Sequence, residues 1–309
     1  MPPSLASPGA SGNSSKSCRA RRLESLGYST LFVPDHFHEG FGPIAALTTA
    51  AAATTTLKVA PLVLNTDLRH PAVLARELAS IDVLSMGRLE VGLGAGYNPL
   101  DYQRSGIAMD PPGVRVDRLI EHATVLRELW SQAPTAFEGV HYRIDDLDGT
   151  PKPYTAGGPP LLIAGGGKRM LPFAAQHADI VGVNVALAAA PDEASARDAL
   201  PASIDEKFRR MRTDAGERFD DLEFNAWLTV CRVTDEAQSR GTLEWQVRCS
   251  RRGGARLPAH PRRDNRGNGR PTRNESGPLG LLILHRSATG DRRLRSRCSS
   301  VDGLVIPAP

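Results

Sequence analysis

The sequence has few cysteines, few aromatic residues and no long apolar run, and each scarcity excludes a class of protein. Among 309 residues there are 4 cysteines, and aromatic residues make up 5%. Cys18, Cys249 and Cys298 lie near the ends of the chain, so a disulfide framework is excluded and a reducing cytoplasm is the expected location. No apolar run approaches the ~20 residues that a membrane span needs. The basic N-terminal residues are not followed by the apolar segment of a signal peptide.

Lysine is absent from residues 240–309, and patterned apolar residues are scarce there. This segment has 15 arginines and 5 acidic residues, a net charge of +10, whereas residues 1–239 carry a net charge of −6. Low hydrophobicity and like charges leave too little apolar surface to offset the entropy of an ordered chain. The sequence therefore predicts three segments: an irregular one over 1–18, a folded domain over 19–236, and a disordered Arg-rich tail over 237–309.

Between about residues 20 and 235, short apolar runs alternate with amphipathic segments. The runs are rich in Val, Leu and Ile without strict alternation, which is typical of parallel strands buried on both faces. They span residues 28–33, 57–64, 88–95, 160–164, 179–184 and 223–231.

The segments between these runs predict helices over 71–85, 113–131, 167–177 and 202–216. The first of them opens with Pro71, which loses no hydrogen bond in a first helical turn. The stretch 134–160 differs, because FEGVHYRI predicts a hairpin inserted between a helix and the next strand. Six units of strand and helix favour an α/β barrel over a doubly wound sheet.

Chemistry in parallel α/β folds gathers where strands end, because the loops there are free to vary. The first apolar run ends in Pro34, and Asp35, His36 and His38 follow it directly. His36 could serve as a general base or a hydrogen-bond donor, since imidazole titrates near neutral pH. The alternative is a histidine of a surface loop.

A His-x-His pair at a strand end also begins the metal site of some barrel hydrolases. A metal ion needs further nitrogen or oxygen ligands at later strand ends. The ends at 92–96 and 165–167 offer glycine, and the end at 63–67 offers Asn65 and Asp67 without a histidine. The sequence therefore predicts no metal site.

Two strand ends are rich in glycine. Gly92, Gly94 and Gly96 do not have the spacing of a dinucleotide-binding fingerprint. Residues 165–167 are all glycine and are followed by Lys168 and Arg169 at an expected helix start. Glycine lets backbone N–H groups approach an anion, and a helix N-terminus favours negative charge. This turn predicts phosphate binding; tight packing of strand on helix is the alternative.

Three blocks of sequence carry a resemblance to a known family. They are GYSTLFVPDH at 27–36, HPAVLARELASIDVLSMGRLEVGLGAGY at 70–97, and PLLIAGGGKRMLPFAAQHADIVGVN at 160–184. Together with residues 101–130 they resemble the luciferase-like monooxygenase family. Within it they look most like the oxidoreductases that use the deazaflavin coenzyme F420. The resemblance covers about residues 20–235.

This resemblance implies a (β/α)8 TIM barrel that binds coenzyme F420, or alternatively FMN, at the carboxyl ends of its strands. His36, with Asp35, would lie beside the cofactor ring and assist proton transfer. The resemblance also implies a non-proline cis peptide near Pro61 and Leu62, a small-molecule substrate and a possible homodimer. The implied cofactor-binding residues are Pro61, Leu62, Asn65, Gly94, Gly96, Tyr97, Gly165, Gly166, Gly167 and Lys168.

The chain departs from the family in two respects. Tyr97 stands where the sugar-phosphate dehydrogenases of the family have an acidic residue, which leaves the substrate open. A first strand before residue 17 and a helix, strand and helix after residue 231 are not recognisable, so the barrel is predicted to be incomplete, with two unpaired strand edges. Our hypothesis is that both ends are read out of frame.

Two alternatives to an active enzyme follow from these ends. The first is a non-catalytic remnant. The second is polyanion binding through the Arg-rich tail, which its charge permits. Nucleic acid is not an expected partner, because Trp245 is the only aromatic residue after position 239 and no known binding module is present.

Overall fold

The structure is a computed structural model that describes residues 11–37, 40–184 and 197–226. For residues 11–16 it describes the backbone alone. His38 and the Arg-rich tail lie outside the described residues.

The strands form one curved arc in which every ladder is parallel. Strand β1 pairs with β2, a bridge from Val59 to Leu89 joins β2 to the start of β4, and the arc continues in the order β3-β4-β7-β8-β9. The carboxyl ends of all these strands therefore lie at one edge. The strands are β1 Thr30–Val33, β2 Lys58–Pro61, β3 Leu64–Asn65, β4 Val91–Gly94, β7 Leu161–Gly165, β8 Ile180–Val183 and β9 Glu223–Asn225.

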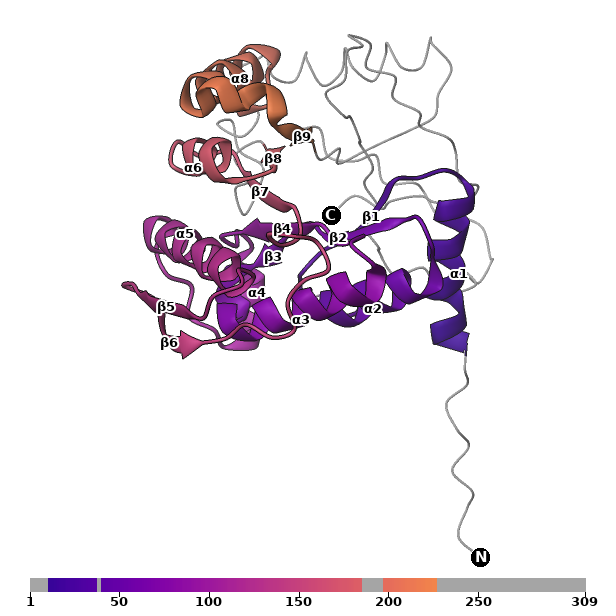
Figure 1. The fold of residues 1–309 in the computed structure, drawn as a ribbon. Helices are drawn as coiled ribbons and strands as arrows, with labels where there is room; N and C mark the ends of the chain where they lie inside the picture. Colours follow the sequence, from indigo (N-terminus) through magenta and orange to yellow (C-terminus); the bar gives the residue numbers. More distant parts are fainter. Residues whose placement is uncertain (1–10, 38–39, 185–196, 227–309) are drawn as a thin grey trace, which may run out of the picture.

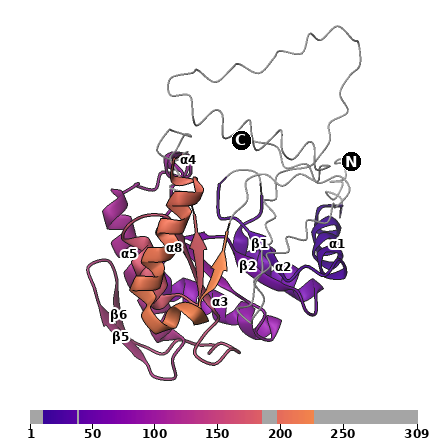
Figure 2. The ribbon, with the colours of Figure 1, turned by 90° about the horizontal axis from the view of Figure 1, so that it is seen from above.

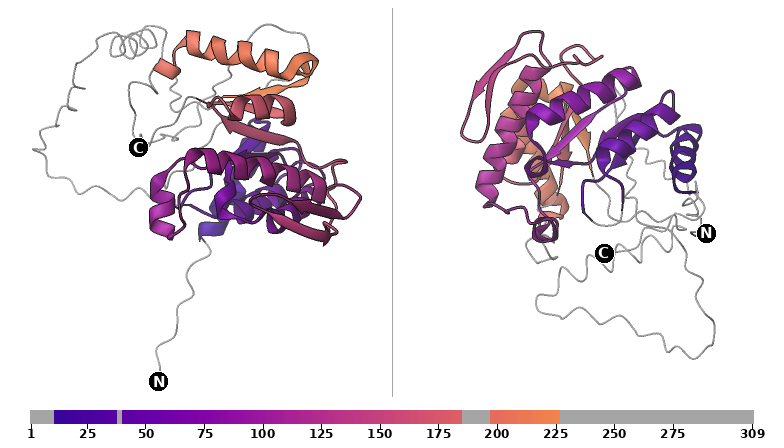
Figure 3. Two further views of the ribbon diagram at one scale, coloured as in Figure 1. Left: turned by 90° about the vertical axis from the view of Figure 1, so that its left-hand side faces the viewer. Right: turned by 90° about the horizontal axis from the view of Figure 1, so that it is seen from below.

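Helices cover the outside of the arc in chain order, from α1 through α2, α3, α5 and α6 to α8 (Figure 1). Figure 3 shows α8 lying along α6 from a second direction. The α-helices are α1 Ser11–Ser25, α2 Pro43–Ala53, α3 Pro71–Ser85, α4 Pro99–Ser105, α5 Pro112–Leu129, α6 Met170–His177 and α8 Pro201–Ala215. Two 3-10 helices, η1 Thr66–Leu68 and η2 Gly216–Asp221, complete the set among the described residues.

Apolar side chains fill two layers, one on each face of the strands. The larger layer lies between strands and helices and includes Leu47, Leu74 and Leu93, all fully buried. The smaller layer lies on the other face and consists of Phe32, Ala60, Leu162, Ala164 and Ile180. Every residue of β4 and of β8 is buried. The prediction of parallel strands buried on both faces is confirmed.

The helix over residues 71–85 is confirmed with the predicted bounds, and α5, α6 and α8 lie within three residues of theirs. The inserted hairpin is also confirmed as β5 Thr135–Glu138 paired with β6 Arg143–Leu147. It lies on the side of the molecule opposite α1 (Figure 2). The carboxylate of Glu121 on α5 accepts three backbone N–H bonds from residues 140–142, which fixes the hairpin turn to the helix.

Three helical segments depart from the sequence prediction. Helix α1 includes residues 11–18, for which irregular structure is predicted. Its second half carries Ala20 and Leu23, both buried, so the helix is anchored there and extends toward the N-terminus. Helices α2 and α4 are not predicted. The run of Ala and Thr in α2 has no polar face to mark a period, and α4 has only seven residues.

Within the described residues, β1 and β9 form the two edges of the arc, and no ladder joins them. The predicted absence of a first strand and of the last elements of the barrel concerns residues outside the described ranges, so it stays a prediction. The backbone groups on the outer sides of these two strands have no strand partner within the described part of the chain.

One exposed carboxylate joins α1 to the segment after α2, and it predicts a pH effect. Glu24 accepts N–H bonds from Thr55, Thr56 and Leu57 at 2.7, 2.6 and 3.0 Å. The bond from Thr56 and then those from Leu57 and Thr55 lower the pKa of Glu24 from 4.5 to about 2. Because the folded pKa is depressed, its contribution to stability is complete above pH 4.5 and is lost as the pH falls toward about 2.

The measurement compares thermal unfolding of the wild type and Glu24→Gln across this pH range. We expect the variant to unfold at a lower temperature near neutral pH, and the difference to shrink below pH 4.5. Glu138→Gln on the exposed part of β5 is the matched control, because its side chain makes no hydrogen bond among the described residues. A difference that stays constant down to about pH 2 would contradict this account.

Candidate functional site

The loop after β1 carries Asp35 and His36 at the carboxyl edge of the arc, as the sequence predicts. Asp35 is buried and its carboxylate binds the Arg69 guanidinium at 2.5 and 3.0 Å. The backbone N–H of Asn65 donates to the same carboxylate at 3.0 Å. Both oxygens of Asp35 are thus bonded within the protein and hold the loop in place. The predicted catalytic role of Asp35 stays a prediction.

His36 lies beside a carboxylate that the sequence analysis did not select. Its Nδ1 is 2.6 Å from Oδ2 of Asp101, and the N–H of Phe37 donates to Oδ1 of the same residue at 3.0 Å. The edge of the ring faces Tyr97, with ring centroids 5.6 Å apart and planes at 90°. The side chain of His36 is 21% exposed, so it is accessible at the edge, whereas that of Asp101 is 7% exposed.

Asp101 belongs to the first turn of α4. The side chain of Asn98 caps this helix by accepting from the N–H of Leu100 at 3.1 Å, and Pro99 occupies its first position. A capping Asn, a Pro and an acidic residue in the first turn are the signals of a helix start. That pattern could have placed Asp101 at a helix N-terminus, but its pairing with His36 spans 65 positions of sequence.

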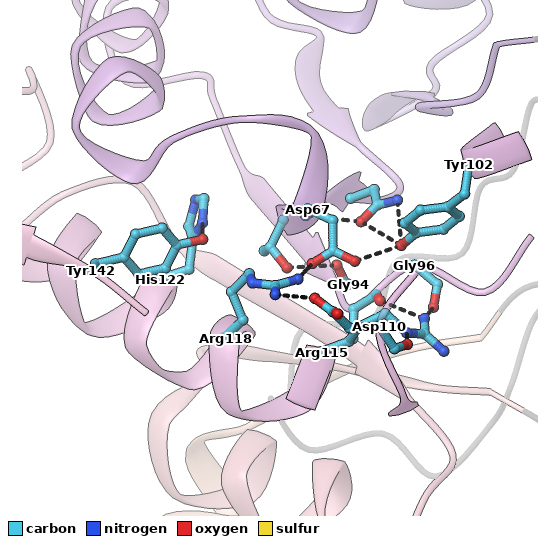
Figure 4. A network of polar contacts seen from close by, with 12 residues as sticks. Asp67, Gly94, Gly96, Tyr102, Asp110, Arg115, Arg118, His122 and Tyr142 are labelled. Carbon is cyan, nitrogen blue, oxygen red and sulfur yellow. Dashed lines mark hydrogen bonds and ion pairs between the residues drawn. The ribbon is translucent and has the colours of Figure 1, made fainter. Parts of the chain in front are cut away.

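A buried polar network holds η1 and α4 together (Figure 4). The hydroxyl of Tyr102 donates to Asp67 at 2.7 Å and accepts from the amide of Asn65 at 3.0 Å. Burial and then the bond to Asp67 raise the pKa of Tyr102 to about 12, so the hydroxyl stays a donor. The carbonyl oxygen of Asn65 also accepts from the N–H of Asp67. Its predicted contact with a cofactor stays a prediction.

Two arginines of α5 join the same network, one at the loop between β4 and α4 and the other at η1 (Figure 4). Arg115 donates to the carbonyl oxygens of Ala95 and Gly96. Arg118 binds Asp67 at 2.6 Å and also pairs with Asp110. Burial lowers the pKa of Arg118, but its bonds to the two carboxylates outweigh burial and raise it.

The glycines of β4 and the following loop are explained by packing. A Cβ at Gly94 would collide with the side chain of Val63, and a Cβ at Gly96 would collide with Tyr102 and Asn65. Gly96 also has φ of +69°, a conformation that other residues rarely adopt. Close approach within the protein therefore accounts for both residues, which the sequence analysis assigned to cofactor binding.

The residues of the turn after β7 differ in how closely other atoms of the protein pack against them. A Cβ at Gly165 would collide with Met170, whereas the space around Gly167 is open within 4 Å. Lys168 is exposed and makes no ion pair among the described residues. Arg169 pairs with Asp117 of α5 and also donates to the carbonyl of Gly113 at 3.3 Å. The turn therefore presents one uncommitted cation, Lys168, in front of the N-terminus of α6.

A non-proline cis peptide occurs between Leu62 and Val63 at the end of β2. The resemblance placed such a bond near Pro61 and Leu62, so this prediction is confirmed to within one residue. Pro61 is the last residue of β2 and is buried. Leu62 and Val63 pack against the smaller apolar layer. Both predicted positions thus lie at the carboxyl edge.

His36 and the turn at Gly165–Gly167 lie at the same edge of the arc, where strands β1 and β7 end. In the order β1, β2, β4, β7 they are three strand spacings apart, about 14 Å along the sheet. An elongated ligand with a ring at one end and a phosphate at the other could reach both.

Titratable groups elsewhere do not form a metal site. Within the described part of the chain, no group of three or more His, Cys, Asp and Glu side chains is arranged to hold a metal ion. His122 of α5 is fully buried, and its Nδ1 lies 3.3 Å from the hydroxyl of Tyr142. Burial and then the charge of His70 lower the pKa of His122 to about 3, so it is a neutral core residue.

The parallel arc of strands with helices on its outside defines a fold class, the α/β barrels. The family of luciferase-like monooxygenases matches residues 17–276. The chain belongs to this family, which confirms the predicted family and the predicted type of barrel. The matched range runs past residue 236, into the part of the chain outside the described residues.

Several relatives carry the name of a monooxygenase. The pyrimidine monooxygenase RutA of an Enterobacter species is 34% identical over 188 residues, which cover 58% of this chain and 49% of RutA. The corresponding protein of Pantoea ananatis is 31% identical over 233 residues, covering 73% and 58%. The chain thus spans about half the length of these relatives, and 64% of an uncharacterized mycobacterial relative with 29% identity.

Solved structures of a reductase and of a monooxygenase share the fold. The coenzyme F420-dependent tetrahydromethanopterin reductase of Methanopyrus kandleri superposes with a TM-score of 0.57 at 22% identity, covering 70% of this chain and 62% of the reductase. The monooxygenase RslO1 of Streptomyces bottropensis gives 0.61 at 21% identity, covering 77% and 72%. No helix in the described ranges is both long and apolar enough to cross a bilayer.

Proposed function

We propose that this protein is an oxidoreductase that binds coenzyme F420 and exchanges a hydride between that cofactor and a small-molecule substrate. The observation that carries the proposal is the shared edge: His36 on the loop after β1 and the glycine turn after β7 both lie at the carboxyl ends of one parallel arc. The proposal also includes the homodimer and the cytoplasmic location that the sequence analysis predicts.

The residues at this edge fit a phosphorylated ring cofactor. The open space at Gly167, the exposed ammonium of Lys168 and the N-terminus of α6 form a place where a phosphate would be held by backbone N–H groups and one positive charge. Phe37 and Tyr97, 54% and 40% exposed, supply apolar surface beside His36 for a ring.

The chain's own contribution to the reaction is orientation and proton transfer. The bound cofactor supplies hydride transfer, which no side chain can perform. His36 lies beside the proposed place of the ring. Its imidazole can give a proton to a substrate oxygen that changes from carbonyl to hydroxyl, or accept one in the reverse direction. Asp35 fixes the loop that carries His36.

FMN-dependent monooxygenation is the second candidate function. It is favoured by one observation, the relatives named pyrimidine monooxygenase RutA, one of which is 34% identical over 188 residues. Polyanion binding by the Arg-rich tail stays a prediction, because that segment lies outside the described residues. A non-catalytic remnant is the outcome if neither cofactor binds.

Cofactor titration tests the proposal and separates the candidates. We expect saturable quenching or enhancement of F420 fluorescence, with weaker binding of FMN. Replacing Lys168 by Ala removes the cation near the phosphate and should raise the Kd for F420 about tenfold, or about 1.4 kcal/mol. The reason is the loss of one charge-assisted hydrogen bond to the phosphate.

Lys152→Ala is the matched control, because Lys152 pairs with Asp148 in the loop after the hairpin and lies away from the strand ends. Its Kd should equal that of the wild type. Tight FMN binding with no F420 binding would establish the second candidate instead. Failure of folded, monodisperse protein to bind either cofactor would rule out both.

A further inference from the structure

We propose that Asp101 is the positioning residue of His36: it holds the proton of the imidazole on Nδ1 and thereby leaves the lone pair on Nε2. Neither the sequence pattern nor the family match assigns Asp101 a role. The catalytic consequence rests on the proposed function, whereas the proton position rests on geometry alone.

The two contacts of Asp101 fix the direction of its hydrogen bonds. Oδ1 accepts from the backbone N–H of Phe37 at 3.0 Å, and this group can only donate. Oδ2 lies 2.6 Å from Nδ1 of His36. An ionised carboxylate has acceptors only, so the hydrogen between the two side chains belongs to Nδ1. A neutral imidazole with its proton on Nδ1 has its basic lone pair on Nε2.

Asp101 can impose this orientation because α4 is held rigidly. The next residue, Tyr102, is 2% exposed and is bonded to Asp67 and to Asn65. Arg115 binds the carbonyl oxygens of the loop that leads into the helix. The network in Figure 4 therefore has a use beyond packing: it anchors the short helix that carries Asp101.

The histidine loop is held from a second side as well. Asp35, the residue before His36, is bonded to Arg69 and to the N–H of Asn65. The loop is thus held on both sides of His36. The carboxylate of Asp35 holds the residue before it, and the carboxylate of Asp101 binds the backbone N–H of the residue after it. Because both neighbours are held, the only freedom left to His36 is rotation of its ring, and the bond to Asp101 removes it.

A purely structural role for Asp101 makes a different prediction. If Asp101 served only to accept from Phe37, asparagine would replace it fully, since the amide oxygen accepts the same bond. If Asp101 also orients His36, the amide NH2 of the asparagine instead faces Nδ1 of His36 and can only donate. The imidazole must then accept at Nδ1 and carry its proton on Nε2. The position of the proton distinguishes the two roles.

The experiment is NMR of the full chain with histidine labelled by the heavy nitrogen isotope, at a pH where His36 is neutral. Comparison with His36→Gln assigns its signals among the 8 histidines. We expect a protonated Nδ1 and an unprotonated Nε2 in the wild type, and the reverse in Asp101→Asn. Asp101→Glu should keep the wild-type pattern, because glutamate is also an acceptor only.

Asp82→Asn is the matched control. Asp82 of α3 is likewise buried and accepts a backbone N–H, that of Thr155, at 2.8 Å. Its substitution should leave the signals of His36 unchanged. A wild-type spectrum with the proton on Nε2 would overturn the proposal, and this result does not depend on whether Asp101→Asn folds. An unchanged proton position in folded Asp101→Asn would also overturn it.

Kinetics supply the second readout. Asp101→Asn should lower the rate of hydride transfer about 10- to 100-fold, part of the gain that a positioned acid or base provides. The Kd for F420 should stay within about twofold, because the phosphate end of the site is untouched. If the proton moves as expected but wild-type protein binds no cofactor, the proposed function fails while the positioning of His36 by Asp101 stands.

Discussion

Replacing Arg69 with methionine is expected to lower the free energy of unfolding by about 3 kcal/mol, the largest stability effect we predict for a single residue at the site. Asp35 is 7% exposed, and Arg69 is its only side-chain partner among the described residues. Removal of Arg69 leaves a buried carboxylate with one backbone N–H bond, which does not compensate for its lost hydration. Urea denaturation followed by circular dichroism measures the change.

The same pair predicts a partial recovery. In the double variant Asp35→Asn, Arg69→Met the buried charge is gone, and the amide oxygen can still accept from the N–H of Asn65. We expect this variant to regain about half of the lost stability, because an uncharged polar group is cheaper to bury than an ion. Arg143→Ala, on the exposed part of β6, is the control for loss of an arginine. A loss below about 1 kcal/mol for Arg69→Met would show that water reaches Asp35.

The alternation of elements could be predicted from the sequence because it depends on local periodicity. Residues 71–85 carry apolar side chains at helical spacing after a proline, and the helix has those bounds. The strands are predicted as apolar runs, and β1, β2, β4 and β8 are shorter than the runs that predict them. Helix α2 was missed because a stretch of alanine and threonine has no periodic contrast, even though Leu47 and Ala50 are buried.

Contacts between distant residues explain what the sequence could not predict at the site. Asp35 and His36 were selected together because they are adjacent, yet they face different partners. Asp35 is paired with an arginine 34 positions away and His36 with a carboxylate 65 positions away. No local pattern distinguishes a carboxylate that anchors a loop from one that takes part in chemistry. Only the pairing across the carboxyl edge does so.

The glycines show the same limit. Gly94, Gly96 and Gly165 look alike in sequence to Gly167, and all four were assigned to the cofactor. At the first three a side chain would collide with residues of the protein itself, and at Gly167 it would not. Glycine is thus explained by packing at three positions, and close approach of a ligand is a reason for glycine at the fourth.

Substituting His36 with glutamine is expected to reduce the rate of hydride transfer about 100-fold, with little change in the Kd for F420. Glutamine is close to histidine in size and can still hydrogen-bond to Asp101, but it cannot gain or lose a proton near neutral pH. The change therefore removes proton transfer while it preserves the shape of the loop. Stopped-flow absorbance of the cofactor gives the rate, and fluorescence titration gives the Kd.

The comparison with Lys168→Ala makes this result specific. Lys168 follows β7 and His36 follows β1, two strands about 14 Å apart along the sheet, so the two residues should affect different parameters. Loss of the lysine weakens binding and leaves the rate at saturating cofactor nearly unchanged, whereas loss of the imidazole lowers that rate and leaves binding unchanged. If both variants changed only binding, His36 would contact the cofactor without transferring a proton, and the acid–base role would be wrong. The two effects should separate because one ligand would be bound by its phosphate after β7 and would react at its ring after β1, and neither side chain spans that distance.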